Sequence, residues 1–261
     1  MSKSKQLFIK LTRSFWVRSV FFMVVWVYKY PPFIKDYFRY KKSAKKLGDG
    51  RFVSTSYKLF PSLFDKTKTT NFDPHYTYHP AWAARIVAKN RPTKHIDISS
   101  ILHFSTLLSA FVPVEFYDYR PANVILSNLQ CKQADLLNLP FEDNSVESLS
   151  CMHTIEHVGL GRYGDPIDAN GDLKASKELA RVLKQNGTFI FVAPIGKPLI
   201  EFNSHRIYSY EQVMDMFKSL KLKEFSMIPD NFKESGLITN ADKNLVKNQD
   251  WACGCFWFTK K

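Results

Sequence analysis

The stretch from His95 to Asp118, which reads HIDISSILHFSTLLSAFVPVEFYD, decides the fold of this chain. It opens with an apolar run of the length of a short buried strand, continues through a helical pattern at 101–111, and closes with a second strand at 114–118. The same alternation continues downstream, with strands predicted at 131–135, 145–151 and 188–194 and helices at 121–129, 173–183 and 210–220. Strands that alternate with helices predict an α/β domain with a mostly parallel sheet, doubly wound and Rossmann-like.

Acidic residues end the first strands of this predicted sheet. Asp97 closes the first strand, Asp118 closes the second 21 residues later, and Asp135 follows the third. Ligands of such sheets bind at the carboxyl ends of the strands, where an ionised carboxylate can accept hydrogen bonds from both hydroxyls of a ribose. Asp135 is placed to accept a hydrogen bond from an exocyclic amine such as that of adenine.

Two longer motifs carry a family resemblance. They are ADLLNLPFEDNSVESLS at 134–150 followed by HTIEHV at 153–158, and the helix and strand at 178–193. Together they resemble class I S-adenosylmethionine-dependent methyltransferases, over roughly residues 80–261. The resemblance implies a sheet of about seven strands whose last strand, 253–259, runs antiparallel.

The same resemblance implies a binding site for S-adenosylmethionine. Asp118 would hold the ribose and Asp135 the adenine amine, Asp97 would lie beside the methionine end, and Ser99 and Leu136 would complete the cofactor-binding residues.

The loop after the first strand departs from the family pattern. The family has a glycine-rich loop here, because the backbone approaches the cofactor closely. Residues 97–103 contain no glycine, and Ile101 and His103 are expected to crowd a cofactor lying against them. An alternative therefore stays open, in which the fold binds a glycan precursor without the adenosyl cofactor.

The loop after the fourth strand is dense in polar residues. His153, Glu156 and His157 are candidates for the base that methyl transfer to a hydroxyl requires, and His205 is a fourth candidate from a later loop. The candidates for acceptor binding are Arg162, Asp165, Asp168 and Arg206. The arginines suit a carboxylate or phosphate, whereas the aspartates are equally typical of turns and helix caps.

Two metal interpretations are weaker. His153, Glu156 and His157 have the H-x-x-E-H spacing of inverted zinc peptidases, which makes a metal-dependent hydrolase a lesser alternative. The motif follows a strand directly and has no long flanking helix, so we predict no metal ligands. Cys253 and Cys255 are expected to be two residues of a strand.

A narrower resemblance concerns the acceptor. GLGRYGDPID at 159–168 and EFNSHR at 201–206 resemble an uncharacterised bacterial branch known only as a domain of unknown function, associated with surface-polysaccharide enzymes. It implies a small polar acceptor such as a saccharide or sugar nucleotide.

The charge is concentrated at the N-terminus. The chain has 37 Lys and Arg against 24 Asp and Glu, and residues 1–50 hold 12 of these basic groups but only two acids, Asp36 and Asp49. The rest is nearly neutral, which argues against nucleic acid as a partner. The uncharged run 19–28 is too short to span a bilayer, so it predicts either a core helix or an interfacial anchor on anionic membrane through residues 1–45.

Composition and local pattern set the expected organisation. Four cysteines are too few and too scattered for a disulfide scaffold, and they indicate a cytoplasmic protein, with the inner membrane face as a peripheral location. The expected segments are a basic arm at 1–50, an adapter or lid at 51–80, and the methyltransferase-like domain at 81–261, which begins with a helix at 81–89.

Overall fold

A computed structural model describes residues 15–47 and 57–261 of the chain. The chain divides into two compact units, Met1–Asn71 and Phe72–Lys261, which are described separately. The first 14 residues of the predicted membrane-binding arm lie outside the described residues.

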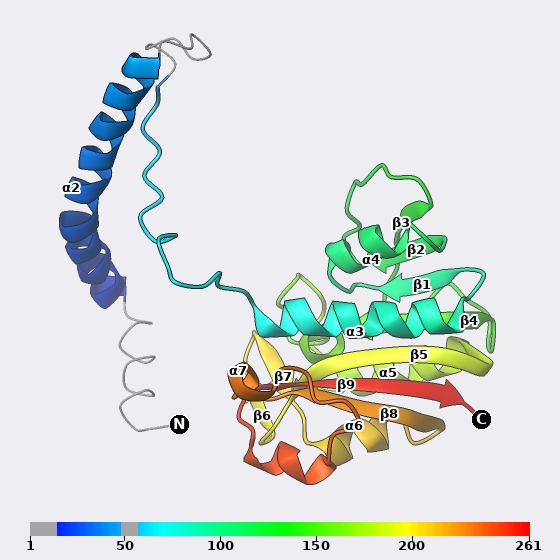
Figure 1. Cartoon of the computed structure of the whole chain (residues 1–261). Coiled ribbons are helices and arrows are strands. Elements are labelled where there is room, and N and C mark those ends of the chain that lie inside the picture. Colours follow the sequence, from blue (N-terminus) through cyan, green and yellow to red (C-terminus); the bar gives the residue numbers. More distant parts are fainter. Residues whose placement is uncertain (1–14, 48–56) are drawn as a thin grey trace. The chain divides into compact units, whose positions relative to one another are not determined.

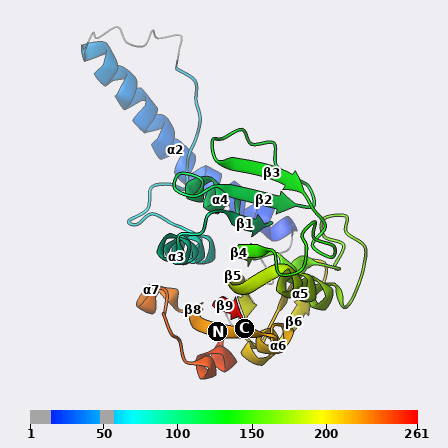
Figure 2. The same ribbon diagram turned by 90° about the vertical axis from the view of Figure 1, so that its right-hand side faces the viewer.

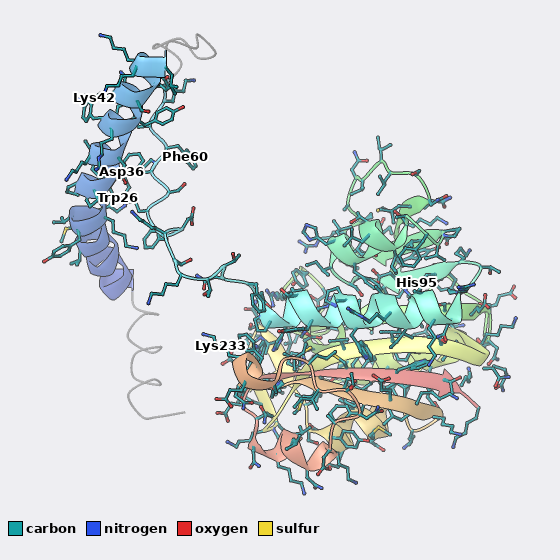
Figure 3. All side chains as sticks on the ribbon, viewed as in Figure 1. Trp26, Asp36, Lys42, Phe60, His95 and Lys233 are labelled. Atoms are coloured by element: carbon teal, nitrogen blue, oxygen red, sulfur yellow. The ribbon has the colours of Figure 1, made fainter. Side chains whose placement is uncertain are left out.

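In its described residues, the N-terminal unit contains the long helix α2 (Phe15–Leu47). The sequence predicts that Lys29 and the two following prolines end the apolar run, but the helix continues through Pro31 and Pro32. The ring of Tyr30 contacts those of Trp26 and Phe33, with centroids 4.9 and 5.7 Å apart, so aromatic packing bridges the prolines. Figure 3 shows side chains of α2. Among the residues that the structure describes, none of the helices combines the length and the hydrophobicity that a membrane span requires.

In the described part of the second unit, seven strands form one sheet in the order β3-β2-β1-β4-β5-β9-β8. They are β1 (His95–Ile98), β2 (Val114–Asp118), β3 (Leu129–Gln133), β4 (Val146–Met152), β5 (Leu183–Ile195), β8 (Leu220–Ile228) and β9 (Ala252–Lys260). The sheet is parallel except for β9, which pairs antiparallel with both β5 and β8. This confirms the predicted Rossmann-like fold with an antiparallel last strand.

Helices cover both faces of the sheet (Figures 1 and 2). One face carries α3 (Pro74–Asn90) and α4 (Leu102–Leu108), and the other carries α5 (Gly171–Val182) and α6 (Tyr210–Met216). Each pair buries its own apolar cluster against the strands, Trp82, Ile86 and Phe104 on one side and Leu179, Val213 and Phe217 on the other. The short elements are the hairpin β6 (Leu199–Glu201) and β7 (His205–Ile207), α7 (Phe232–Ser235), and the 3₁₀ turns η2 (Ile155–His157) and η3 (Lys243–Asn248).

Two predicted helices differ from the structure. Residues 121–129 contain no helix: Val124 packs against the core while its neighbour Ile125 is 97% exposed, so the apolar residues of this segment do not share one buried helical face. The helix predicted from residue 81 begins instead at Pro74. Asp73 caps it by accepting a hydrogen bond from the Tyr76 amide, and proline suits the first helical position. Residues 74–80 therefore belong to the domain.

Candidate functional site

The strand order reverses between β1 and β4, and the candidate site lies at the carboxyl ends of these strands. Ser99, the first residue after β1, has φ = 54°, a left-handed conformation that favours glycine. Its hydroxyl donates to the Tyr117 carbonyl over 3.2 Å. Ser99 thus adopts a left-handed conformation that glycine normally adopts, in a loop that contains no glycine.

Asp97 lies beneath this loop and is fully buried. Its carboxylate accepts hydrogen bonds from Ser150, over 2.7 Å, and from Ser105. Burial raises the pKa of Asp97 to about 6, against the effect of the serine hydrogen bonds. Asp97 is not part of either cavity wall described below, so its observed role is to fix the loop between β1 and α4.

A chain of hydrogen bonds extends this buried network to His95. Because the Ser150 hydroxyl donates to Asp97, it must accept from Nε2 of His95, 2.9 Å away. The other ring nitrogen then accepts from Ser148 over 2.8 Å. Burial lowers the pKa of His95 to about 3, so the ring is neutral. The hydrogen-bonding groups of His95, Ser148 and Ser150 are thus satisfied within the sheet, and no uncompensated positive charge is buried there.

A crevice of about 260 Å³ opens between the ends of β1, β2 and β4. Its lining includes Ser99, Asp118, Asp135, Leu136 and His157. One oxygen of Asp118 accepts the Arg120 amide over 2.7 Å, and one oxygen of Asp135 accepts the Leu137 amide over 2.9 Å. The structure therefore brings four of the five residues predicted to bind the cofactor to one crevice.

The crowding predicted from Ile101 and His103 is not observed in this crevice, since neither residue lines it. Ile101 lines a second, adjoining cavity, whereas His103 is exposed.

The second cavity has a volume of about 740 Å³. It shares Ser99, His153, His157 and Tyr163 with the crevice, so the two spaces adjoin. Its other walls include aromatic and charged residues from distant segments, among them Asp73, His75, Tyr76, Asp230, Phe232 and Trp251. The arrangement offers a compartment for a second ligand next to the crevice.

His157 lies at the junction of the two spaces. Its Nδ1 is 2.6 Å from the Ser204 carbonyl, which can only accept, so Nδ1 carries the proton and Nε2 a lone pair. Burial lowers the pKa of His157, against the opposing charge of Glu156. Arg162 donates to the same carbonyl over 3.1 Å. His157 is therefore a neutral imidazole with a basic nitrogen.

Glu156 is 1% exposed and lies between two histidines. Its Oε1 accepts from His153 Nδ1 over 2.9 Å and is 3.9 Å from Nε2 of His157. Burial favours the neutral acid, but the hydrogen bond from His153 and the charges of His153 and His157 together outweigh it, so that the pKa of Glu156 is lowered. Its Oε2 is buried without a hydrogen-bond partner among the residues that the structure describes.

The remaining predicted site residues separate into two groups. Arg162 and His205 line the larger cavity, and Asp165 lines the crevice while accepting the Gly159 amide over 2.7 Å. Arg206 is buried, donates to the Val158 carbonyl over 2.7 Å and lines neither space.

Asp168 also lines neither space and pairs with Lys174 over 2.6 Å. Arg206 and Asp168 therefore make contacts that stabilise the loop, and neither residue lines a cavity. Among the H-x-x-E-H residues, Nδ1 of His153 is engaged with Glu156 and Nδ1 of His157 with the Ser204 carbonyl, which leaves one Nε2 on each ring.

Sequence reasoning missed several residues of the walls. The ring of Tyr163 contacts two guanidinium groups, with Arg120 and Arg162 at 4.7 and 5.1 Å from its centroid. His75 and Trp251 also reach the cavity, and their rings lie 5.8 Å apart. The sequence does contain one signal for His75: Asp73 followed by Pro74 is typical of the start of a helix, and His75 lies in the first turn of that helix.

Known proteins match parts of the chain. A family model described as "Caenorhabditis protein of unknown function, DUF268" matches residues 140–238. An uncharacterized protein of Methanocaldococcus jannaschii is 32% identical over 103 residues, 38% of this chain and 36% of that protein. The uncharacterized methyltransferase YcgJ of Bacillus subtilis is 34% identical over 83 residues, 31% of this chain and 28% of that protein. The chain spans about a third of the length of these relatives.

Solved structures of methyltransferases share the fold. The N-methyltransferase NodS of Bradyrhizobium japonicum, in complex with S-adenosylhomocysteine, superposes with a TM-score of 0.50 at 11% identity, covering 73% of this chain and 89% of that chain. A putative sarcosine dimethylglycine methyltransferase of Galdieria sulphuraria has a TM-score of 0.50 at 15% identity, covering 70% and 85%. The domain therefore has the fold of S-adenosylmethionine-dependent methyltransferases.

Proposed function

We propose that the domain transfers a methyl group from S-adenosylmethionine to a hydroxyl of a small polar acceptor. The observation that carries this proposal is the position of His157, a neutral histidine at the junction of two adjoining spaces. The crevice suits a nucleoside cofactor, and the larger cavity suits the acceptor.

The crevice fits an adenosyl group by the chemistry of its walls. Asp118 and Asp135 each have one carboxylate oxygen bonded to a nearby amide, which leaves the other for the ribose and the adenine amine, respectively. The left-handed Ser99 turns the backbone at the place where a cofactor must approach closely. Leu136 adds an apolar surface to the crevice. When bound, S-adenosylmethionine supplies an electrophilic methyl group.

His157 is the proposed general base. Its Nε2 accepts the proton that the acceptor hydroxyl loses as its oxygen is methylated, while the proton on Nδ1 remains there, hydrogen-bonded to the Ser204 carbonyl. The ring then becomes a cation, which the Glu156 carboxylate, 3.9 Å from Nε2, stabilises. The pair thus supplies both a base and a counter-charge.

The acceptor that we propose is a saccharide or sugar nucleotide of surface-polysaccharide synthesis. Aromatic rings of Tyr76, Phe232 and Trp251 offer apolar faces to the larger cavity, while Arg162 and Asp230 offer charged partners for hydroxyl and phosphate groups. Such a mixed lining suits a ligand with both polar edges and apolar faces.

Calorimetry with S-adenosylmethionine and S-adenosylhomocysteine tests the proposal. The wild type should bind both, and Asp118→Ala should weaken binding at least tenfold. Asp215→Ala, which removes an exposed carboxylate on α6, is the matched control and should bind like the wild type. Absence of binding by the wild type would overturn the proposal and favour a glycan-binding protein without the cofactor. Release of S-adenosylhomocysteine with a panel of sugar nucleotides then tests the acceptor class.

We also propose peripheral contact with anionic membrane through residues 1–45. The described part of this segment supports it, since α2 exposes Met23, Trp26 and Val27 beside basic residues. The full chain should co-sediment with vesicles that contain anionic lipid and not with neutral vesicles. Equal sedimentation with both would contradict this.

A further inference from the structure

We propose that His75, His153 and Cys253 form a binding site for a divalent transition metal, best suited to Zn²⁺, at the wall of the larger cavity. The three residues come from α3, the end of β4 and β9, and one ligand atom of each lies within 4.8 Å of the others. The proposal does not depend on cofactor binding and goes beyond the methyl transfer proposed above.

The distances suit a small tetrahedral ion. Nε2 of His153 is 3.5 Å from Sγ of Cys253. Tetrahedral zinc with its usual Zn–N and Zn–S bond lengths holds a nitrogen and a sulfur about 3.6 Å apart. This pair is therefore already at the spacing of two zinc ligands.

His75 is the third ligand. Its ring centroid is 5.3 Å from that of His153, and two imidazoles on one tetrahedral zinc have centroids about 5 Å apart. Its ring now lies nearly parallel to those of His153 and Trp251, so binding requires it to turn a nitrogen toward the ion. His75 itself lines the larger cavity.

A buried carboxylate orients His153 toward this ion. Glu156 accepts the His153 Nδ1 proton over 2.9 Å, which leaves Nε2 as the ligand atom facing Cys253. Carboxylate–histidine–metal chains of this kind fix the tautomer of the ligand and raise its basicity. His153 also has φ = 54°, and a strained backbone of this kind concentrates at functional sites.

An unsatisfied buried carboxylate oxygen beside the three ligands points to a missing cation. Oε2 of Glu156 is buried and has no hydrogen-bond partner within the described ranges. Buried polar groups are rarely left unpaired, because desolvation then costs about 1–3 kcal/mol each. A divalent ion would compensate the negative charge of Glu156.

The donor set selects the class of metal and ligand. Two imidazoles and one thiolate suit zinc and related transition metals, whereas magnesium and calcium prefer oxygen. Three protein ligands leave a fourth position open, as in catalytic rather than structural zinc sites. His75 and His153 line the larger cavity, so this position faces the acceptor and would take an acceptor oxygen or water.

Metal binding by the full chain tests the site. The protein should bind about one Zn²⁺ per chain by elemental analysis after dialysis. Co²⁺ should produce a thiolate-to-cobalt charge-transfer band. Cys253→Ser should abolish this band, His75→Gln should retain it while lowering Zn²⁺ affinity at least tenfold, and Glu156→Gln should lower affinity roughly 10- to 100-fold.

The matched controls are Cys131→Ser and His103→Gln, which alter a thiol and an imidazole elsewhere in the domain and should bind metal like the wild type. Circular dichroism confirms that each variant is folded. A wild type that binds neither ion, or a folded Cys253→Ser variant with an unchanged cobalt spectrum, would overturn the site.

Discussion

His157 donates its Nδ1 proton to the carbonyl oxygen of Ser204 over 2.6 Å. The contact joins the turn after β4 to the loop between β6 and β7, 47 residues later in the chain. It fixes both the tautomer and the orientation of the ring, because a carbonyl oxygen cannot donate. The basic nitrogen is therefore held at the junction of the two cavities before any ligand binds.

Replacement of His157 should separate catalysis from binding. His157→Gln should reduce S-adenosylhomocysteine formation roughly 10²–10⁴-fold, the usual contribution of a general base. Cofactor affinity, measured by calorimetry, should change little, because Asp118 and Asp135 are unaltered. His103→Gln is the control, since this exposed histidine lines neither cavity. A rate unchanged in His157→Gln would show that another group, or none, takes the proton.

The protonation of His157 can be measured without an acceptor. Burial lowers the pKa of this imidazole below its ordinary value of 6.5, so at pH 6.5 more than half of the rings should be neutral. The neutral fraction should fall only as the pH drops through the lowered pKa. Nuclear magnetic resonance titration of the histidine side chains, with His157→Gln to assign the signal, measures it. A midpoint above 6.5 would contradict the environment described for this ring.

The left-handed conformation of Ser99 predicts a difference between two variants. Both Ser99→Gly and Ser99→Ala lose the hydroxyl bond to Tyr117, but only alanine keeps a Cβ at φ = 54°. The glycine variant should therefore be the more stable of the two by about 1 kcal/mol, as measured by urea denaturation. Equal stabilities would show that the loop relaxes around a side chain. The comparison is internal, since each variant serves as the control for the other.

The parts of the site that follow strands could be predicted from the sequence. Asp118 and Asp135 come after short apolar runs, and the carboxyl ends of parallel strands meet at one edge of a sheet. Asp97 follows the same rule in sequence, yet it is buried beneath the loop. A strand-end acid can face either the ligand or the serines behind it, and the pattern alone does not distinguish them.

The rest of the site depends on long-range packing. His75 and Trp251 lie 78 and 98 residues from His153 in the chain, so no local spacing links the three. Residues 73–80 have many aromatics and no clear period, which suggests a loop, but the capping aspartate and the proline after it start a helix. The left-handed turn at Ser99 has no sequence signal, since glycine is the residue that normally marks it.

The two arginines predicted to bind the acceptor should behave differently. Arg206 is buried with its guanidinium 3.5 Å from the Asp172 carboxylate, whereas Arg162 is exposed at the larger cavity. Arg206→Ala should lower the free energy of unfolding by about 3 kcal/mol, because it leaves the buried Asp172 carboxylate without its positive partner, although Tyr208 still donates a hydrogen bond to it. Arg162→Ala should change stability by less than about 1 kcal/mol and weaken acceptor binding instead. Equal destabilisation by both variants, in thermal or urea unfolding, would contradict this division.

The buried carboxyl group of Asp97 predicts how stability depends on pH. Its pKa is about 6 in the folded domain, against an ordinary value of 3.8. Between these values the folded state retains a proton that the unfolded state has lost, so stability falls as the pH rises from about 4 to about 6. Across this window the free energy of unfolding should fall by about 3 kcal/mol in total.

Asp97→Asn should remove this contribution, because an amide does not titrate. Relative to the wild type, the variant should therefore become progressively more stable as the pH rises across the same window, and the difference should level off above it. The neutral His95 contributes with the opposite sign, because its lowered pKa makes stability fall as the pH drops below 6.5. It is present in both proteins, so the difference reports Asp97 together with its coupling to His95 through Ser150. Urea unfolding at several pH values, with the exposed Asp215→Asn as control, measures the difference. A difference in unfolding free energy that does not vary with pH would mean that Asp97 ionises normally and that its serine partners, rather than burial, set its charge.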